Sequence, residues 1–330
     1  MSFLSQIPLT TNFTESKIIL IILLFILCFV IIPSCFLAYF GSLVAFNTVL
    51  RRNDKTKWAR EPKITNDDQA KMYEIGYAWN NKYINHKTDV HIINEGLNLY
   101  GEYYDFGNKR CVIIMSGRTE GLRYGYFFSE PYRQSGYNVL VIDPRAHGNS
   151  DGEFIALGFE ECKDATAWAK LLHDKFGNEQ IIFHGICIGA AGSMYALINE
   201  NCPEYLIGMV AEGMFVNFGE SFKNHLIEFK IPRVIVFRLI KKFFTKHTGH
   251  SMDNGPYDVI DKLRKPLLML HSKEDTYSTP EFAEKLFEKC SSPSKEIVWF
   301  PKGRHSMLRI TDMERYDTAI KEFIKKNFDN

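Results

Sequence analysis

The residue best suited to chemistry is a cysteine framed by glycines. Gly185-Ile186-Cys187-Ile188-Gly189 follows a short apolar run and precedes a stretch of small residues. Glycines at these spacings permit a sharp turn between a strand and a helix, and such a turn exposes the central side chain. The start of a helix also favours a thiolate, because the helix dipole is positive there. An isolated cysteine is more often a small buried residue, but this glycine frame favours a nucleophile.

A thiol nucleophile needs a base, and the base needs an acid that orients it. Asp275 follows the apolar run 268–270, with Glu274 beside it as a second candidate for the acid. His305 lies in the loop after the last apolar run. Asp275 could equally cap a helix that begins near Pro280, and one histidine among ten carries little information. Together, at the ends of predicted strands, the three side chains predict a Cys187–His305–Asp275 triad.

Backbone N–H groups beside the nucleophile would stabilise a negatively charged tetrahedral intermediate. One donor is Ile188, directly after Cys187. The second is expected in the loop after the apolar run 111–115, where Arg118 is best placed.

Positioning these residues requires a particular sheet. Apolar runs alternate with amphipathic stretches along most of the chain, which is typical of a parallel sheet covered by helices on both faces. The fold class is therefore α/β, a doubly wound and mostly parallel sheet whose first two strands form a hairpin around residues 94–96. The strands are predicted at 90–93, 97–103, 111–115, 137–143, 180–184, 205–211, 266–271 and 296–300.

Between about residues 214 and 264 this alternation breaks. Residues 231–244 are apolar at helical spacing, with basic residues interleaved. The segment is either a helical cap over the site or a satellite helix packed on the core.

The N-terminal region has a different character. No charged side chain occurs from Ile18 to Leu50, and roughly 20 apolar residues are enough for a helix to cross a bilayer. A signal peptide would have a shorter apolar region, and a buried core helix is the remaining alternative. We expect a tail at 1–17, a transmembrane helix at 18–46, a juxtamembrane linker at 47–88 and the catalytic domain at 89–330. The chain is then a single-pass membrane protein.

The charges that flank the apolar segment favour a cytoplasmic domain. Lys17 precedes the segment, whereas six basic residues follow it between Arg51 and Lys63, and positive flanks tend to stay in the cytoplasm. Large domains can cross regardless of charge, so the side is left open.

Composition argues against several other classes of function. Forty basic and thirty-nine acidic side chains give a net charge of +1, so no broad basic surface for nucleic acid is expected. The seven cysteines form no CxxC pair and the chain has no HExxH motif. We therefore expect neither a disulfide framework nor a metal site, and no cofactor.

From about Asp89 to Asn327 the chain resembles the α/β-hydrolases. It is most similar to membrane-anchored hydrolases of the serine aminopeptidase-like and monoglyceride-lipase-like groups. Five segments carry the resemblance: the Ser116-Gly117 loop, the D-x-R-x-x-G-x-S segment at 143–150, the elbow around Cys187, the acid Asp275 and the loop at 303–305. The resemblance implies that His147 is part of the scaffold rather than catalytic.

Two positions depart from that family. Most members have serine where this chain has Cys187, and His-Gly where it has Ser116-Gly117. The loop acts through backbone N–H groups, so the second change is compatible with activity. Members similar to dienelactone hydrolase and polyhydroxyalkanoate synthase use cysteine at the elbow, which implies a thioester acyl-enzyme.

Three functions follow as hypotheses. The first is an acyl hydrolase that cleaves an ester, thioester or related bond in a small molecule with an apolar acyl group. Phenylalanines near the expected mouth favour such a group, although they could equally be core: Phe127, Phe128, Phe215, Phe222 and Phe237. The alternatives are an acyltransferase on the same triad and a catalytically silent binding protein.

Overall fold

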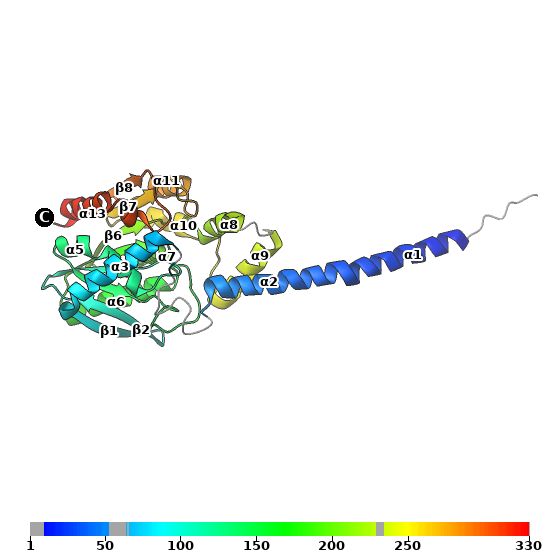
Figure 1. The fold of residues 1–330 in the computed structure, drawn as a ribbon, viewed down its shortest axis with the longest axis horizontal. Helices are drawn as coiled ribbons and strands as arrows, with labels where there is room; N and C mark the ends of the chain where they lie inside the picture. Colours follow the sequence, from blue (N-terminus) through cyan, green and yellow to red (C-terminus); the bar gives the residue numbers. More distant parts are fainter. Residues whose placement is uncertain (1–9, 53–63, 65, 229–233, 330) are drawn as a thin grey trace, which may run out of the picture.

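Eight strands form one sheet in the order β1-β2-β4-β3-β5-β6-β7-β8. They belong to a computed structural model that describes residues 10–52, 64, 66–228 and 234–329 (Figure 1). The strands are β1 (Lys87–Asn94), β2 (Leu97–Tyr104), β3 (Arg110–Met115), β4 (Asn138–Ile142), β5 (Gln180–Ile186), β6 (Leu206–Glu212), β7 (Leu267–Ser272) and β8 (Lys295–Phe300).

The sheet is parallel except at one edge, as the sequence predicts. β1 pairs antiparallel with β2, and β2 pairs antiparallel with β4. The remaining pairs, from β4 through β3 and β5 to β8, are all parallel. The predicted hairpin turn is confirmed, with Glu95 and Gly96 both at positive φ between β1 and β2. Because parallel strands point the same way, the loops after β3, β5, β6, β7 and β8 meet at one edge of the sheet.

Helices cover both faces of the sheet. One hydrophobic cluster contains buried residues of α6, α7 and α11, among them Trp168, Met194 and Leu286. A second cluster, on the other face, contains residues of α3, α5 and α13, among them Tyr132 and Phe323. The helices of the domain are α3 (Asp67–Lys82), α4 (Leu122–Gly125), α5 (Glu130–Gln134), α6 (Glu161–Phe176), α7 (Ile188–Leu197), α8 (Phe218–Glu228), α9 (Val234–Thr248), α10 (Pro256–Val259), α11 (Pro280–Lys289), α12 (Leu308–Thr311) and α13 (Met313–Phe328).

The insertion between β6 and β7 is helical, as expected, and consists of α8, α9 and α10 in the described residues. Phe237, Ile240 and Phe244 of α9 are buried. They share a third hydrophobic cluster with Phe218 and Phe222 of α8. The insertion is thus packed on the domain, and α8 borders the edge of the sheet where the loops meet.

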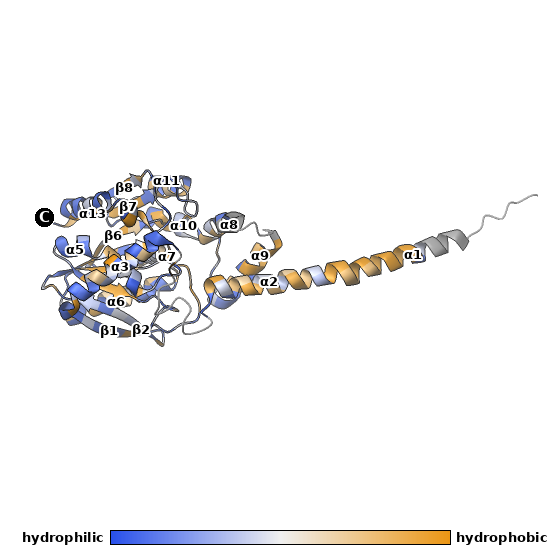
Figure 2. Ribbon diagram, viewed as in Figure 1, coloured by the Kyte–Doolittle hydropathy of each residue, from blue (hydrophilic) through white to orange (hydrophobic). Residues whose placement is uncertain are grey.

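A long apolar helix precedes the domain (Figure 2). It consists of α1 (Thr10–Ile26), one π-helical turn at Leu27–Ile31 and α2 (Ile32–Leu50). The stretch Ser16–Leu50 has 35 residues and a mean hydropathy of 3.3 in its most apolar window, enough in length and composition to cross a membrane. We call this element the N-terminal helix.

The segment between the N-terminal helix and β1 contains α3, which packs on the sheet. Met72, Tyr73 and Trp79 of α3 are buried in the second hydrophobic cluster. Most of the predicted linker before α3, at residues 53–63, lies outside the described residues.

Candidate active site

Cys187 occupies the sharp bend between β5 and α7. Its backbone has φ 53° and ψ −107°, a conformation that L-residues rarely adopt and that is typical of functional turns. The Cys187 N–H donates to the Glu212 carbonyl oxygen at 2.9 Å, which ties the bend to β6. The two elbow glycines have no room for a side chain. A Cβ at Gly185 would lie 2.4 Å from the Ala190 Cα, and one at Gly189 would lie 2.1 Å from the Met115 carbonyl oxygen.

The Gly189→Ala variant is expected to destabilise the domain by about 3 kcal/mol or more, because its methyl group would overlap backbone atoms of β3 that cannot move aside. Thermal unfolding of the full chain in detergent measures the effect. Gly41→Ala is the matched control, since nothing lies within 4 Å of its added Cβ. Equal melting temperatures for the two variants would contradict this account of the elbow.

His305 and Asp275 form a hydrogen-bonded pair above the bend. The His305 Nδ1 lies 2.7 Å from the Asp275 Oδ2. The other carboxylate oxygen of Asp275 accepts the Tyr277 and Ser278 N–H groups at 2.8 and 2.9 Å. These bonds fix the acid, and the His305 side chain also forms a hydrogen bond with Cys187. Glu274, the second candidate for the acid, is exposed, and in the described part of the chain no hydrogen bond links it to His305.

The electrostatics of the pair favour its charged form. Burial by itself would raise the pKa of Asp275, but the charge of His305 and the hydrogen bond from it lower that pKa below its usual value. Burial lowers the pKa of His305, yet the charges of Asp275 and Cys187 outweigh it and raise the pKa well above its usual range. These interactions stabilise a proton on His305, so the imidazole can serve as an acid as well as a base.

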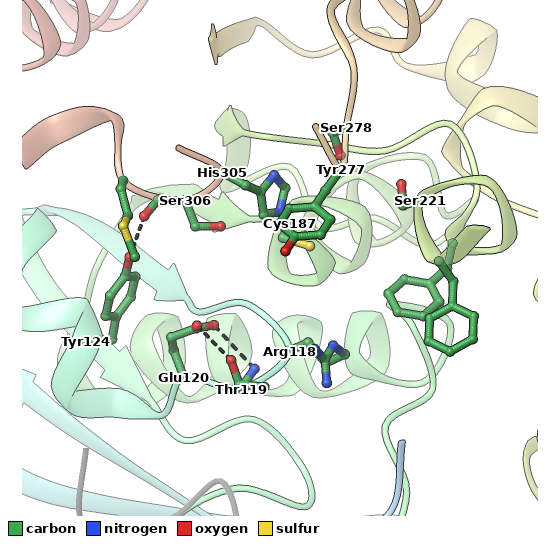
Figure 3. A pocket seen from close by; sticks show the side chains of 13 residues that line it. Arg118, Thr119, Glu120, Tyr124, Cys187, Ser221, Tyr277, Ser278, His305 and Ser306 are labelled. Carbon is green, nitrogen blue, oxygen red and sulfur yellow. Dashed lines mark hydrogen bonds between the residues drawn. The ribbon is translucent and has the colours of Figure 1, made fainter. Parts of the chain in front are cut away.

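Cys187 and His305 open into the same cavity of about 330 Å³. Figure 3 shows the Cys187 sulfur beside the His305 and Tyr277 rings, with Arg118 on the facing wall. The Tyr277 ring meets the His305 ring edge-on at 5.5 Å. The apolar part of the cavity wall is formed by Phe218, Phe222 and Met307. The structure thus brings the three predicted triad residues together at the carboxyl ends of β5, β7 and β8.

The two predicted backbone donors also lie at this edge. Arg118 and Ile188 line a small hollow beside the elbow, together with Gly117 and Gly189. Ile188 is the first residue of α7, so its N–H has no acceptor within the helix. The His147 Nε2 lies 2.7 Å from the Arg118 carbonyl oxygen, and its Nδ1 lies 2.9 Å from the Arg145 carbonyl oxygen. His147 lines the small hollow but not the cavity that holds Cys187, and its contact with Arg118 holds that loop in place, in keeping with a scaffold role.

Residues 143–150 also help to hold the Arg118 loop in place. The Asp143 carboxylate accepts the Leu122 and Asn149 N–H groups at 2.8 Å each. Arg145 forms a bidentate salt bridge with Asp164, in which its Nε and Nη2 each donate to a carboxylate oxygen at 2.7 Å. The side chains of Asp143, Arg145 and Asp164 do not line the cavity that holds Cys187, in keeping with a structural role.

Comparison with known proteins places the chain among relatives. No protein-family model matches the sequence. The chain is 30% identical over 218 residues to the uncharacterized protein YqkD of Bacillus subtilis, a match that covers 64% of this chain and 70% of YqkD. The chain belongs to the same family as YqkD. An uncharacterized membrane protein of Saccharomyces cerevisiae is 28% identical over 60% of this chain and 64% of its own length.

Part of the chain also matches a lipase. Monoglyceride lipase of Saccharomyces cerevisiae is 29% identical over 95 residues, which cover 28% of this chain and 30% of the lipase.

Solved structures identify the fold of this YqkD relative as that of the α/β-hydrolases. The esterase Pf2001 of Pyrococcus furiosus superimposes with a TM-score of 0.62 at 21% identity, over 81% of this chain and 97% of the esterase. The α/β-hydrolase GrgF of a Penicillium species superimposes with a TM-score of 0.59 at 16% identity, over 74% of this chain and 99% of GrgF. The predicted fold class is confirmed.

One residue of the site was not anticipated. Glu212 ends β6, is fully buried and accepts the Leu308 N–H at 3.1 Å and the Tyr316 hydroxyl at 2.6 Å. Tyr316 in turn reaches the His184 Nε2 at 3.2 Å. Burial raises the pKa of Glu212 to about 7, although the hydrogen bonds from Tyr316 and Leu308 oppose the shift. The sequence feature that could have identified Glu212 is an acidic residue at the carboxyl end of an apolar strand.

The Glu212→Gln variant is expected to change how stability depends on pH. The native state of the wild type holds this proton more tightly than the unfolded chain, since the pKa is about 7 rather than 4.5. The free energy of unfolding therefore falls as pH rises from about 4.5 to 7, by about 3 kcal/mol relative to a group that does not titrate. Denaturation of both proteins across this range measures the difference. Parallel curves would show that the carboxyl is not perturbed.

Proposed function

We propose that the chain is a membrane-anchored acyl hydrolase that works through Cys187, His305 and Asp275 and a covalent acyl-enzyme. The observation that carries the proposal is the strained turn that presents Cys187 to the same cavity as the His305–Asp275 pair. Esterases and other hydrolases among the solved structures of this fold support the reaction class. The apolar stretch of 35 residues and the yeast relative described as a membrane protein support the anchor.

In the first half of the reaction the Cys187 thiolate attacks the acyl carbonyl carbon. The carbon–sulfur bond forms, and the carbonyl oxygen gains negative charge, which the N–H groups of Ile188 and Arg118 stabilise by donating hydrogen bonds to it. The tetrahedral intermediate then collapses, and the bond to the leaving alcohol or thiol breaks. His305 gives the leaving group its proton, which the raised pKa of the imidazole makes available.

In the second half, water attacks the thioester. His305 is now neutral and takes a proton from this water, so hydroxide adds to the acyl carbon. Collapse releases the carboxylic acid and restores the Cys187 thiolate and the His305 imidazolium. Asp275 orients the ring through the Nδ1 proton in both halves. The apolar wall of Phe218, Phe222 and Met307 suits an apolar acyl group.

Trapping the acyl-enzyme tests this proposal. The full chain in detergent is incubated briefly with an acyl ester and quenched in acid, and its peptides are analysed by mass spectrometry. We expect a mass increase equal to the acyl group on the peptide that carries Cys187, removable by hydroxylamine as a thioester is. Cys202→Ala is the control, because burial raises the pKa of the Cys202 thiol and it lies away from the cavity. An adduct on another residue, or turnover without one, would overturn the covalent mechanism.

A further inference from the structure

The N-terminal helix changes surroundings along its length. Its large apolar side chains are exposed almost continuously from Ile18 to Phe40. From Ser42 onward every fourth residue is buried against the domain: Ser42, Phe46 and Leu50. A bilayer core takes up about 20 residues of helix, so the exposed apolar stretch accounts for it. The last turns of α2 then belong to the domain, and the membrane surface lies close to Gly41.

Helix α9 packs on α2 at this level. The Phe243 ring lies 5.4 Å from the Tyr39 ring and 5.9 Å from the Phe46 ring. The His247 ring stacks on Phe46 at 5.4 Å. Figure 1 shows α9 alongside the end of the N-terminal helix that meets the domain. These contacts place α9 next to the point where the N-terminal helix would leave the bilayer.

The face of α9 turned away from the domain is cationic. A shallow hollow on this face is also lined by Lys241, Thr245, Ser251 and Asp253, and five of its residues lie at helical spacing on α9: Ile235, Arg238, Leu239, Lys242 and Lys246. Ile235 is 64% exposed, a large value for an isoleucine. No ion pair neutralises the three basic side chains within the described residues, whereas the nearby Lys241 pairs with Asp253 at 2.7 Å. We call the five residues Ile235, Arg238, Leu239, Lys242 and Lys246 the α9 basic face. Basic residues mixed with exposed apolar ones are typical of a helix that lies on an anionic membrane surface.

The opposite face of α9 leads to the cavity. Phe237 stacks on Phe222 with ring centroids 6.1 Å apart, and Phe222 stacks on Phe218 at 5.9 Å. Phe222 and Phe218 line the cavity that holds Cys187. Phe46 and Leu50 of the N-terminal helix belong to the same hydrophobic cluster. A continuous apolar region therefore extends from the base of the N-terminal helix to the nucleophile.

The cavity wall is also joined directly to the N-terminal helix. The Arg118 Nη1 donates to the Val49 carbonyl oxygen at 3.1 Å. Phe40 and Val49 are about 13 Å apart along the helix axis. The cavity thus lies within the length of one acyl chain of the inferred membrane surface.

We propose that the α9 basic face lies on an anionic membrane surface and that the acyl substrate is a long-chain lipid taken from that leaflet. The proposal rests on the proposed function, because it needs both the membrane anchor and the acyl hydrolase. Basic side chains would contact lipid phosphates, while the cavity lined by Phe218 and Phe222 would accept the acyl chain.

Lysine footprinting tests the membrane contact without using activity. The full chain is reconstituted into phosphatidylcholine vesicles or into vesicles with equal parts of phosphatidylcholine and phosphatidylglycerol. A water-soluble amine reagent then labels exposed lysines. We expect phosphatidylglycerol to slow labelling of Lys242 and Lys246 severalfold, and high salt to reverse the effect. Lys325 is exposed on α13, at the other end of the domain in Figure 1, and should label equally in both vesicles. Equal labelling of Lys242 and Lys246 in both vesicles would overturn the contact.

Charge reversal tests the substrate class. The variant Arg238→Glu/Lys242→Glu/Lys246→Glu is expected to lose most hydrolysis of a long-chain diacyl lipid in phosphatidylglycerol vesicles while keeping hydrolysis of a short soluble ester. The matched control Lys262→Glu/Lys321→Glu/Lys325→Glu makes the same change of charge elsewhere on the domain. The variant Arg238→Gln/Lys242→Gln/Lys246→Gln removes the charges without reversing them and so controls for misfolding. It should show an intermediate loss of lipid hydrolysis. Equal lipid hydrolysis by the glutamate variant and the wild type overturns the proposal. Failure of the wild type to cleave even the soluble ester instead counts against the proposed function.

Discussion

The Cys187→Ala variant is expected to lose turnover of acyl esters, with kcat/KM falling on the order of 10⁴-fold. Removing the sulfur removes the only atom that forms the covalent bond, and the His305–Asp275 pair then has no nucleophile to serve. The fold should survive, because alanine is smaller and its backbone can be held by the same Cys187–Glu212 main-chain contact. Steady-state kinetics with a short soluble ester measure the loss, and circular dichroism checks the fold.

The Cys187→Ser variant separates chemistry from geometry. A hydroxyl at this position faces the same His305 and the same backbone donors, so it should retain measurable turnover above the alanine variant. Cys162→Ala is the control thiol, since burial raises the pKa of Cys162 to about 12 and leaves it unreactive. Full activity in Cys187→Ala would rule out this cysteine as the nucleophile.

The Asp275→Asn variant is expected to lower kcat on the order of 10³-fold and to shift the pH profile. The Asp275 carboxylate raises the pKa of His305 through its charge and hydrogen bond. Without that charge, the imidazolium gives up its proton at lower pH. The limb of the kcat profile that reports His305 should therefore move towards acid.

The neighbouring acid provides the control for this variant. Glu274→Gln removes one carboxylate next to Asp275, but Glu274 is exposed and leaves the His305 Nδ1 bond intact. Its kcat and pH profile should match those of the wild type. A profile that moves with Glu274→Gln and not with Asp275→Asn would reassign the acid.

The elbow could be predicted from sequence because its determinants are local. Gly185 and Gly189 are needed by the turn itself, and the structure shows backbone atoms where their side chains would be. Asp275 and His305 could also be found, since each follows directly after a predicted strand of a parallel sheet. The sequence favoured Asp275 and kept Glu274 as a second candidate, and the two are distinguished by the hydrogen bond between His305 and Asp275 and by the exposure of Glu274.

Contacts between distant segments could not be predicted. The Glu212 carboxyl meets Tyr316, 104 positions away, and nothing in the sequence around either residue signals the other. The bond from Arg118 to Val49 spans 69 positions and exists only because α2 continues beyond its exposed apolar stretch into the domain. Helix α3 likewise interleaves charged residues with apolar ones, so its packing on the sheet through Met72 and Trp79 depends on the tertiary fold.

The bond between Arg118 and Val49 has a practical consequence for producing the protein. Deleting the apolar segment is a common route to a soluble form of an anchored protein. Here a truncation after Leu50 would remove the carbonyl that holds the Arg118 side chain, together with Phe46 and Leu50 from the cluster that includes Ile188. In the shortened domain the cavity wall would be altered at the Arg118 loop, which is the loop proposed to supply a backbone donor. Purification in detergent or lipid nanodiscs, with the helix retained, preserves the site as it stands in the whole chain.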